Sequence, residues 1–227
     1  MTEIIAIDGT AGAGKSTIGK LLADHLNYLF VDTGVMYRAV TLIALEKGVD
    51  ISSEHQVTRL ADGLEISISI PSVDDGRDCD VLIGDRDVTW DIRSAAVDNH
   101  VSIVAAYPGV RKILSKKQRE IGLQGDVVMM GRDIGTVILP EADLKLFLVA
   151  SLEERANRRY RERIARGEQV DYESILAVMR ERDQIDSNRD VAPLVAAADA
   201  IVIDTDGLSI DDVFNKILAL RKNLRGQ

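Results

Sequence analysis

The chain has 227 residues, of which 46% are hydrophobic and 29% charged, with a formal net charge of −9 at pH 7. This composition is typical of a folded globular domain and excludes a collagen-like or disordered chain. The negative charge argues against binding of nucleic-acid polymers, because releasing counterions from phosphates needs a basic surface. A single cysteine, Cys79, cannot form an internal disulfide, which fits a reducing cytosol.

The first residues lead directly into a short apolar run. They show neither the basic region nor the long apolar segment of a signal peptide. We therefore expect a soluble, cytoplasmic protein without a membrane contact. The length favours one main domain with small appended lobes.

Five short apolar segments have the pattern of buried β-strands. They cover residues 4–7, 28–31, 126–130, 143–149 and 200–204. Helical patterns separate them. The expected helices cover residues 18–26, 34–47, 93–106, 109–121, 151–166 and 171–187. Strands that alternate with helices predict an α/β fold with a five-stranded parallel sheet flanked by helices.

One segment breaks this alternation. Residues 64–70 alternate apolar and polar side chains, and a turn-rich stretch then leads into a second apolar run at 79–83. This is the pattern of antiparallel strands with one face in water. We predict a small antiparallel β insert at about 64–90.

A phosphate-binding loop follows the first strand. Residues 9–16 match G-x-x-x-x-G-K-[ST] and lie between a buried strand and an amphipathic helix, as the mechanism of this motif requires. Its backbone N–H groups and the helix N-terminus attract phosphates, Lys15 can reach the β- and γ-phosphates, and Ser16 can ligate Mg²⁺. The predicted ATP-binding residues are Gly9, Thr10, Ala11, Gly12, Ala13, Gly14, Lys15, Ser16 and Thr17. A glycine-rich turn without a ligand is the alternative.

The loop alone indicates a bound nucleoside triphosphate, which GTPases, ATPases and small-molecule kinases share. A GTPase switch needs an N-K-x-D motif for the base, and residues 215–218 (NKIL) lack its aspartate. Residues 204–207 match D-x-x-G, but this pattern is short and lies far along the chain. The sequence therefore disfavours a GTPase.

Longer motifs indicate a family. DTGVMYR at 32–38 follows the second strand, and YPGVR at 107–111, GRDIGTVILP at 131–140 and ERDQIDSNR at 181–189 come later. Together with the phosphate loop, these strings resemble the bacterial-type cytidylate kinases of the nucleoside monophosphate kinase group, over nearly the whole chain. The resemblance implies transfer of the γ-phosphoryl group of ATP to CMP or dCMP, with Mg²⁺ accompanying ATP. It also implies a P-loop kinase fold with a β insert in the monophosphate-binding lobe, a short helical lid and a monomer.

The resemblance further implies site residues. The acceptor phosphate is bound by Arg38, Arg132 and Arg189; cytosine is read by Ser102, Arg111 and Asp133; the sugar contacts Arg182 and Asp186. Thr33, Gly34 and Tyr37 complete the CMP-binding set.

The residue types suit these roles. Arginine matches phosphate oxygens with two parallel hydrogen bonds. A carboxylate can accept from cytosine N4, and this should disfavour UMP by about 1–3 kcal/mol. On residue type alone, Arg38, Arg182 and Arg189 could equally lie on solvated surfaces. Arg132 and Asp133 carry stronger evidence, because ligands of parallel sheets bind at the carboxyl ends of strands.

An arginine-rich segment spans residues 151–166. It contains six arginines and three glutamates, a local excess of +3. Pairs such as Glu154 with Arg158 and Glu162 with Arg166 would suit an ordinary surface helix. The spacing also suits a mobile lid that projects several arginines toward the phosphates. The predicted catalytic residues are Lys15, Arg132, Arg155, Arg158 and Arg159.

The expected organisation has three parts. The core P-loop domain covers 1–34, 100–150 and 188–227; the monophosphate-binding lobe covers 35–99; the lid and the following helix cover 151–187. Two other functions remain open: a P-loop kinase for another nucleoside monophosphate or a small alcohol, and a nucleotide-binding regulator without turnover.

Overall fold

The computed structural model describes residues 2–188 and 191–225. Five parallel strands form its central sheet in the order β2-β6-β1-β7-β8. Their bounds are β1 (Ile4–Gly9), β2 (Leu29–Asp32), β6 (Val127–Met130), β7 (Leu144–Val149) and β8 (Ile201–Asp204). The structure thus confirms the predicted five-stranded parallel sheet, and each strand lies where its apolar run indicated.

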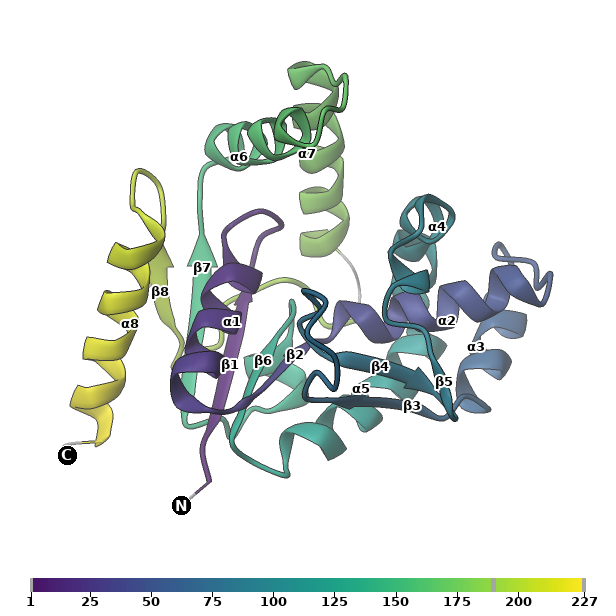
Figure 1. Cartoon of the computed structure of the whole chain (residues 1–227), viewed down its shortest axis with the longest axis horizontal. Coiled ribbons are helices and arrows are strands. Elements are labelled where there is room, and N and C mark those ends of the chain that lie inside the picture. The colour runs from purple at the N-terminus through teal and green to yellow at the C-terminus, as the bar shows by residue number, and fades with distance from the viewer. Residues whose placement is uncertain (1, 189–190, 226–227) are drawn as a thin grey trace.

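Helices cover both faces of this sheet (Figure 1). They are α1 (Lys15–Leu26), α2 (Gly34–Glu46), α3 (Glu54–Asp62), α4 (Ala95–Ala106), α5 (Pro108–Gly122), α6 (Leu152–Ala165), α7 (Tyr172–Asn188) and α8 (Ile210–Arg225). Ile5 and Ile7 of β1 pack into the core beneath α1 and α8, and Ala6 packs into the core on the α2 and α5 side. The alternation of side chains along a strand explains how one strand supplies both cores. No helix in the described residues is long and apolar enough to span a membrane.

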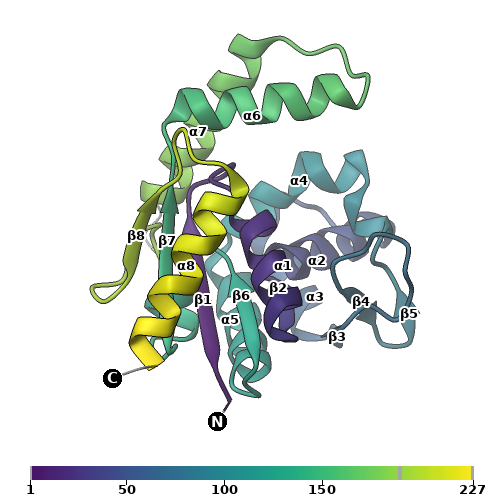
Figure 2. The same cartoon turned by 60° about the vertical axis from the view of Figure 1, so that its left-hand side comes forward.

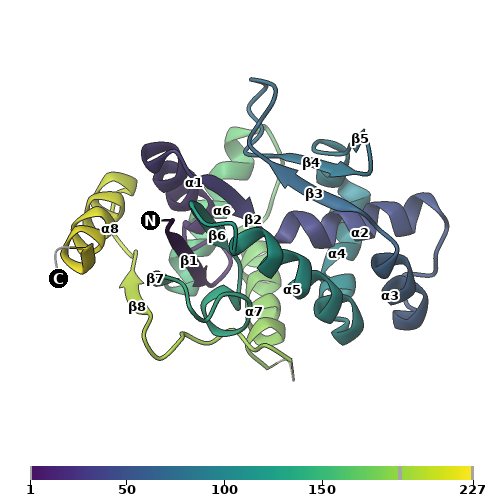
Figure 3. The ribbon, with the colours of Figure 1, turned by 90° about the horizontal axis from the view of Figure 1, so that it is seen from below.

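The predicted β insert is confirmed as a three-stranded antiparallel sheet. Its strands are β3 (Ile66–Ser69), β4 (Asp80–Ile83) and β5 (Arg86–Asp87). Ile68 pairs with Val81, and both side chains belong to the same core as α2. The insert and α8 lie on opposite sides of the molecule (Figure 3).

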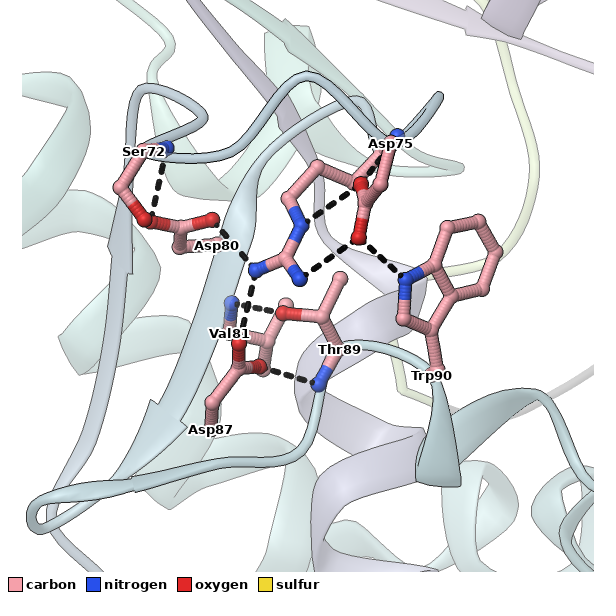
Figure 4. Close-up of polar contacts among 8 residues, drawn as sticks. Ser72, Asp75, Asp80, Val81, Asp87, Thr89 and Trp90 are labelled. Carbon is pink, nitrogen blue, oxygen red and sulfur yellow. Dashed lines mark hydrogen bonds and ion pairs between the residues drawn. The ribbon is translucent and has the colours of Figure 1, made fainter.

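A polar network holds the loop between β3 and β4 (Figure 4). The Arg77 guanidinium, only 6% exposed, donates to the carboxylates of Asp75, Asp80 and Asp87 at 2.7–2.9 Å. The Trp90 indole N–H donates to Asp75 at 2.8 Å, so the loop is also tied to the segment after β5. One cation thus offsets three carboxylates, which would otherwise repel each other.

The carboxyl ends of the central strands point toward one end of the sheet, where α6 and α7 stand above them (Figures 1 and 2). The phosphate loop follows β1, Gly34 begins α2 directly after β2, and residues 131–133 follow β6. A short turn of π-helical form, Ile134–Ile138, comes next, and α6 follows β7. Segments that are far apart in sequence therefore meet at one edge.

Candidate functional site

A cleft of about 900 Å³ opens between the phosphate loop, α6 and α7. Its lining includes Gly12, Gly14, Lys15, Ser16, Thr17, Arg38, Arg155, Arg158, Arg159, Arg163, Met179 and Arg182. Phosphate-loop residues, four arginines of α6 and two residues predicted to bind CMP, Arg38 and Arg182, therefore border one continuous space. A larger groove, about 1130 Å³, lies between α3 and α5, but it shares no lining residue with the cleft.

The phosphate loop has the backbone geometry that its glycines permit. Gly9, Gly12 and Gly14 have φ values of 139°, 81° and 92°, which L side chains rarely adopt. A Cβ at Gly9 would lie 2.0 Å from the Leu148 carbonyl oxygen, so only glycine fits there. The loop thus curls tightly between β1 and α1.

Lys15 is buried within this loop. Its ammonium donates to the carbonyl oxygens of Gly9 and Thr10 at 2.8 and 2.7 Å. Burial holds the pKa of Lys15 well below its usual range, and the positive charge of Arg132 lowers it further. An anion beside Lys15 would stabilise its charged form.

Ser16 and Thr17 are exposed at the start of α1 and border the cleft. Mg²⁺ is usually held by one or two protein oxygens together with substrate phosphates and water. An exposed Ser16 hydroxyl beside the phosphate loop fits this donor set. No group of three or more acidic, histidine or cysteine side chains in the described residues could hold a metal by itself.

A buried ion pair joins two of the residues that were predicted to bind cytosine. Arg111 of α5 donates from Nη2 to Asp133 Oδ2 at 2.6 Å, and both side chains are less than 10% exposed. The guanidinium lies 5.7 Å from the ring centroid of Tyr37, within cation–π range. The Nε of Arg111 is buried and has no hydrogen-bond partner among the described residues. An unused buried donor beside a carboxylate is suited to a polar ligand.

Two further residues predicted to bind CMP, Arg38 and Thr33, donate hydrogen bonds to backbone carbonyl oxygens. Arg38 donates to the Ile92 carbonyl oxygen at 3.0 Å and forms an ion pair with Asp98 at 2.7 Å. The Thr33 hydroxyl donates to the Met130 carbonyl oxygen at 2.9 Å. These contacts join α2 to α4 and to the end of β6.

The other residues predicted to bind CMP differ in how firmly the structure holds them. Arg132 donates from Nε to Asp186 of α7 at 2.8 Å, whereas Arg182 borders the cleft and makes no ion pair within residues 2–188 and 191–225. Ser102 is exposed on α4, and no described residue forms a hydrogen bond with its hydroxyl. Arg189 lies outside the described residues.

The arginines of α6 fit both interpretations of the segment. The ion pairs of Arg158 with Glu154 and Arg166 with Glu162 are present, as expected of a surface helix. Arg158 also donates to the Thr205 carbonyl oxygen at 2.7 Å. Yet Arg155, Arg158, Arg159 and Arg163 all border the cleft, as expected of a lid.

Comparison with known proteins places this chain in a family. The model of the cytidylate kinase family matches residues 5–223. The chain belongs to the cytidylate kinase family. It is 50% identical over 219 residues to the cytidylate kinase of Leuconostoc mesenteroides subsp. mesenteroides, covering 96% of both chains. Identity to the cytidylate kinase of Bacillus licheniformis is 47% over 216 residues, covering 95% of this chain and 94% of that one.

A solved structure shows the same fold. An uncharacterized protein from Eubacterium ventriosum ATCC 27560 aligns over 100% of both chains with a TM-score of 0.50 and 14% identity. At this identity the likeness concerns the fold alone.

This cytidylate kinase family member also has a buried site residue that the motifs did not indicate. Asp8, the charged residue near the end of β1, is 4% exposed and accepts hydrogen bonds from the backbone N–H groups of Ile134 and Gly135 at 2.8 and 2.7 Å. Burial raises the pKa of Asp8 to about 6, although both hydrogen bonds lower it. Asp8 therefore fixes the start of the turn that directly follows Arg132 and Asp133. Its one signal was a charge at the end of an apolar strand.

A second overlooked carboxylate is Asp183 of α7. It pairs with Arg155 through two hydrogen bonds, of 3.1 and 2.6 Å. In sequence, Asp183 was one acid in a charged helix, and nothing distinguished it from its neighbours.

Proposed function

We propose that this protein transfers the γ-phosphoryl group of ATP to CMP or dCMP, giving ADP and CDP or dCDP. The observation that supports this most directly is the buried pair of Arg111 and Asp133 beside the turn after β6. That turn lies next to the phosphate loop, because β6 and β1 are neighbouring strands. A donor loop and a base-reading pair at adjacent strand ends suit a nucleotide kinase.

The pair has the polarity that cytosine requires. An Asp133 carboxylate oxygen can accept from N4, and the unused Nε of Arg111 can donate to a ring acceptor. Uracil presents a carbonyl oxygen where cytosine presents this amino group. In bound UMP, the uracil carbonyl oxygen would therefore face the Asp133 carboxylate without a proton between them. Burying two unpaired acceptors in this way lowers the binding free energy available to UMP.

The phosphates are held by cations on both sides. We assign Arg38, Arg132 and Arg189 to the acceptor phosphate, Arg182 and Asp186 to the sugar, and Ser102 to the base. On the donor side, Lys15 and the loop N–H groups hold the ATP phosphates. Arg155, Arg158 and Arg159 act from the lid, Arg155 through its hydrogen bond to the Ala11 carbonyl oxygen of the loop. Lys15, Arg38, Arg158, Arg159 and Arg182 border one cleft, and this arrangement supports an in-line approach of the two polyanions.

No general base is needed for this reaction. The second pKa of a phosphate monoester is about 6, so the acceptor is largely dianionic at neutral pH. The barrier is mostly electrostatic, and fixed cations at the site lower it without further reorganisation. Mg²⁺ held by Ser16 and the ATP phosphates would neutralise part of the developing charge.

Acceptor-dependent formation of ADP tests the proposal. We expect turnover with CMP and dCMP, and much less with UMP and AMP. Preference for AMP would refute the base assignment and favour a kinase for another monophosphate. ATP binding without turnover on any acceptor would favour a nucleotide-binding regulator. The monomeric state, the cytoplasmic location and the three-part domain division stay predictions.

A further inference from the structure

Helix α7 lies between the donor and acceptor parts of the site. Its first half packs against α6 through Ile175 and Met179. Its second half carries Asp183 and Asp186, which lie three residues apart and therefore on one side of the helix. Each of these carboxylates holds an arginine from another element.

Asp183 holds an arginine that reaches the phosphate loop. The Arg155 guanidinium donates to Asp183, to the Ala150 carbonyl oxygen at 3.0 Å and to the Ala11 carbonyl oxygen at 3.0 Å. Its side chain is only 4% exposed, so these four hydrogen bonds are shielded from water. Four of its five N–H donors are used within the protein, which suits a group that holds other parts in place.

The phosphate loop also packs directly against this pair of helices. A Cβ built on Gly12 would lie 3.1 Å from Met179 Cε and 3.2 Å from Arg155 Cβ. Small displacements of α6 or α7 must therefore be transmitted to the loop.

Asp186 holds an arginine of the acceptor side. Arg132 follows β6 and donates to Asp186 at 2.8 Å, with side chains that are 18% and 15% exposed. A ligand that fixes Arg132 would thus fix this part of α7, and Asp183 lies one turn earlier on the same helix.

We propose that Asp183 is a positioning residue: it holds the phosphate loop through Arg155 and couples occupancy of the acceptor site to the affinity for ATP. This inference rests on the proposed function, because the acceptor ligand is taken to be CMP. Coupling is reciprocal, so ATP must strengthen CMP binding by the same factor. A residue that only stabilises the fold would leave this factor unchanged.

Binding of a non-hydrolysable ATP analogue with Mg²⁺, measured by calorimetry with and without saturating CMP, tests the coupling. In the unmodified protein we expect CMP to lower the Kd of the analogue by roughly fivefold or more. In Asp183→Asn this ratio should fall to nearly one, and KM for ATP should rise by roughly tenfold, because the charge-assisted hydrogen bonds to Arg155 weaken. Arg155→Lys should give the same loss, since lysine cannot reproduce the four hydrogen bonds.

Glu181→Gln provides the matched control. Glu181 is an exposed carboxylate on the same helix, and in the part of the chain that the structure describes it forms no ion pair. This variant should keep both the coupling ratio and KM for ATP.

The coupling ratios of the variants decide whether Asp183 has the proposed role. Unchanged coupling in Asp183→Asn, or an equal loss in Glu181→Gln, would overturn the inference. If Asp183→Asn does not fold, Arg155→Lys decides by the same ratio. An unmodified protein that turns over CMP but shows no coupling would overturn the inference and leave the proposed function intact. Absence of CMP turnover would overturn both.

Discussion

Replacing Asp8 by asparagine should change how protein stability depends on pH. Asp8 is buried, and its pKa rises from 3.8 to about 6. Between these values the folded protein keeps a proton that the unfolded chain has lost, so stability falls as pH rises through this window. The full change corresponds to about 3 kcal/mol, of which about 1.4 kcal/mol falls between pH 5 and pH 7.5. Asparagine cannot titrate, so Asp8→Asn lacks this contribution.

The experiment compares urea unfolding of both proteins, followed by far-UV circular dichroism at pH 5, 6 and 7.5. The amide loses one of the two acceptors for Ile134 and Gly135, which costs a constant amount that does not alter the pH dependence. The free energy of unfolding of the natural protein minus that of Asp8→Asn should decrease by about 1.4 kcal/mol from pH 5 to pH 7.5. A difference that stays constant over this range, or increases, would refute the reasoning.

Four further substitutions test other parts of the structure. Lys15→Ala should abolish ADP formation with every acceptor, because the loop at residues 9–16 contains no other positively charged side chain. Asp133→Ala should reduce the kcat/KM preference for CMP over UMP by roughly tenfold or more while leaving KM for ATP nearly unchanged; equal losses for both acceptors would contradict its role in reading the base. Gly12→Ala should raise KM for ATP at least severalfold, since the added Cβ meets Met179 and Arg155 at a φ of 81°. Arg77→Met should lower the Tm measured by calorimetry, because it leaves three carboxylates facing each other, and an unchanged Tm would show that the network adds no stability.

The phosphate loop and the central sheet could be predicted because their signals are local. The loop is continuous in sequence, and each buried strand is a bounded apolar run. Helix α8 was not predicted, although the sequence contains a signal for its start. Ser209 and Asp212 form reciprocal hydrogen bonds at its start, and this S-x-x-D spacing is a known N-terminal signature. Helix α3 was also not predicted.

The precise geometry of the site could not be predicted, because its contacts join distant residues. Asp8 binds backbone groups 126 and 127 positions away, and Arg155 reaches Ala11 across 144 positions. The π-helical turn at 134–138 is a related case. Its β-branched residues would favour a strand, but hydrogen bonds to Asp8 hold the start of the turn in another form.

Paired charges explain how a protein with net charge −9 can gather so many arginines at one site. Four of these arginines each have an aspartate partner: Arg38 with Asp98, Arg111 with Asp133, Arg132 with Asp186 and Arg155 with Asp183. Unpaired cations at such density would be costly to bury, so the aspartates allow the site to stay folded before a ligand arrives. Among the described site residues, Lys15 and Arg182 are the cations without a carboxylate within ion-pair distance, and both border the same cleft. A nucleotide bound in that cleft can contact these two cations without displacing an aspartate from either of them.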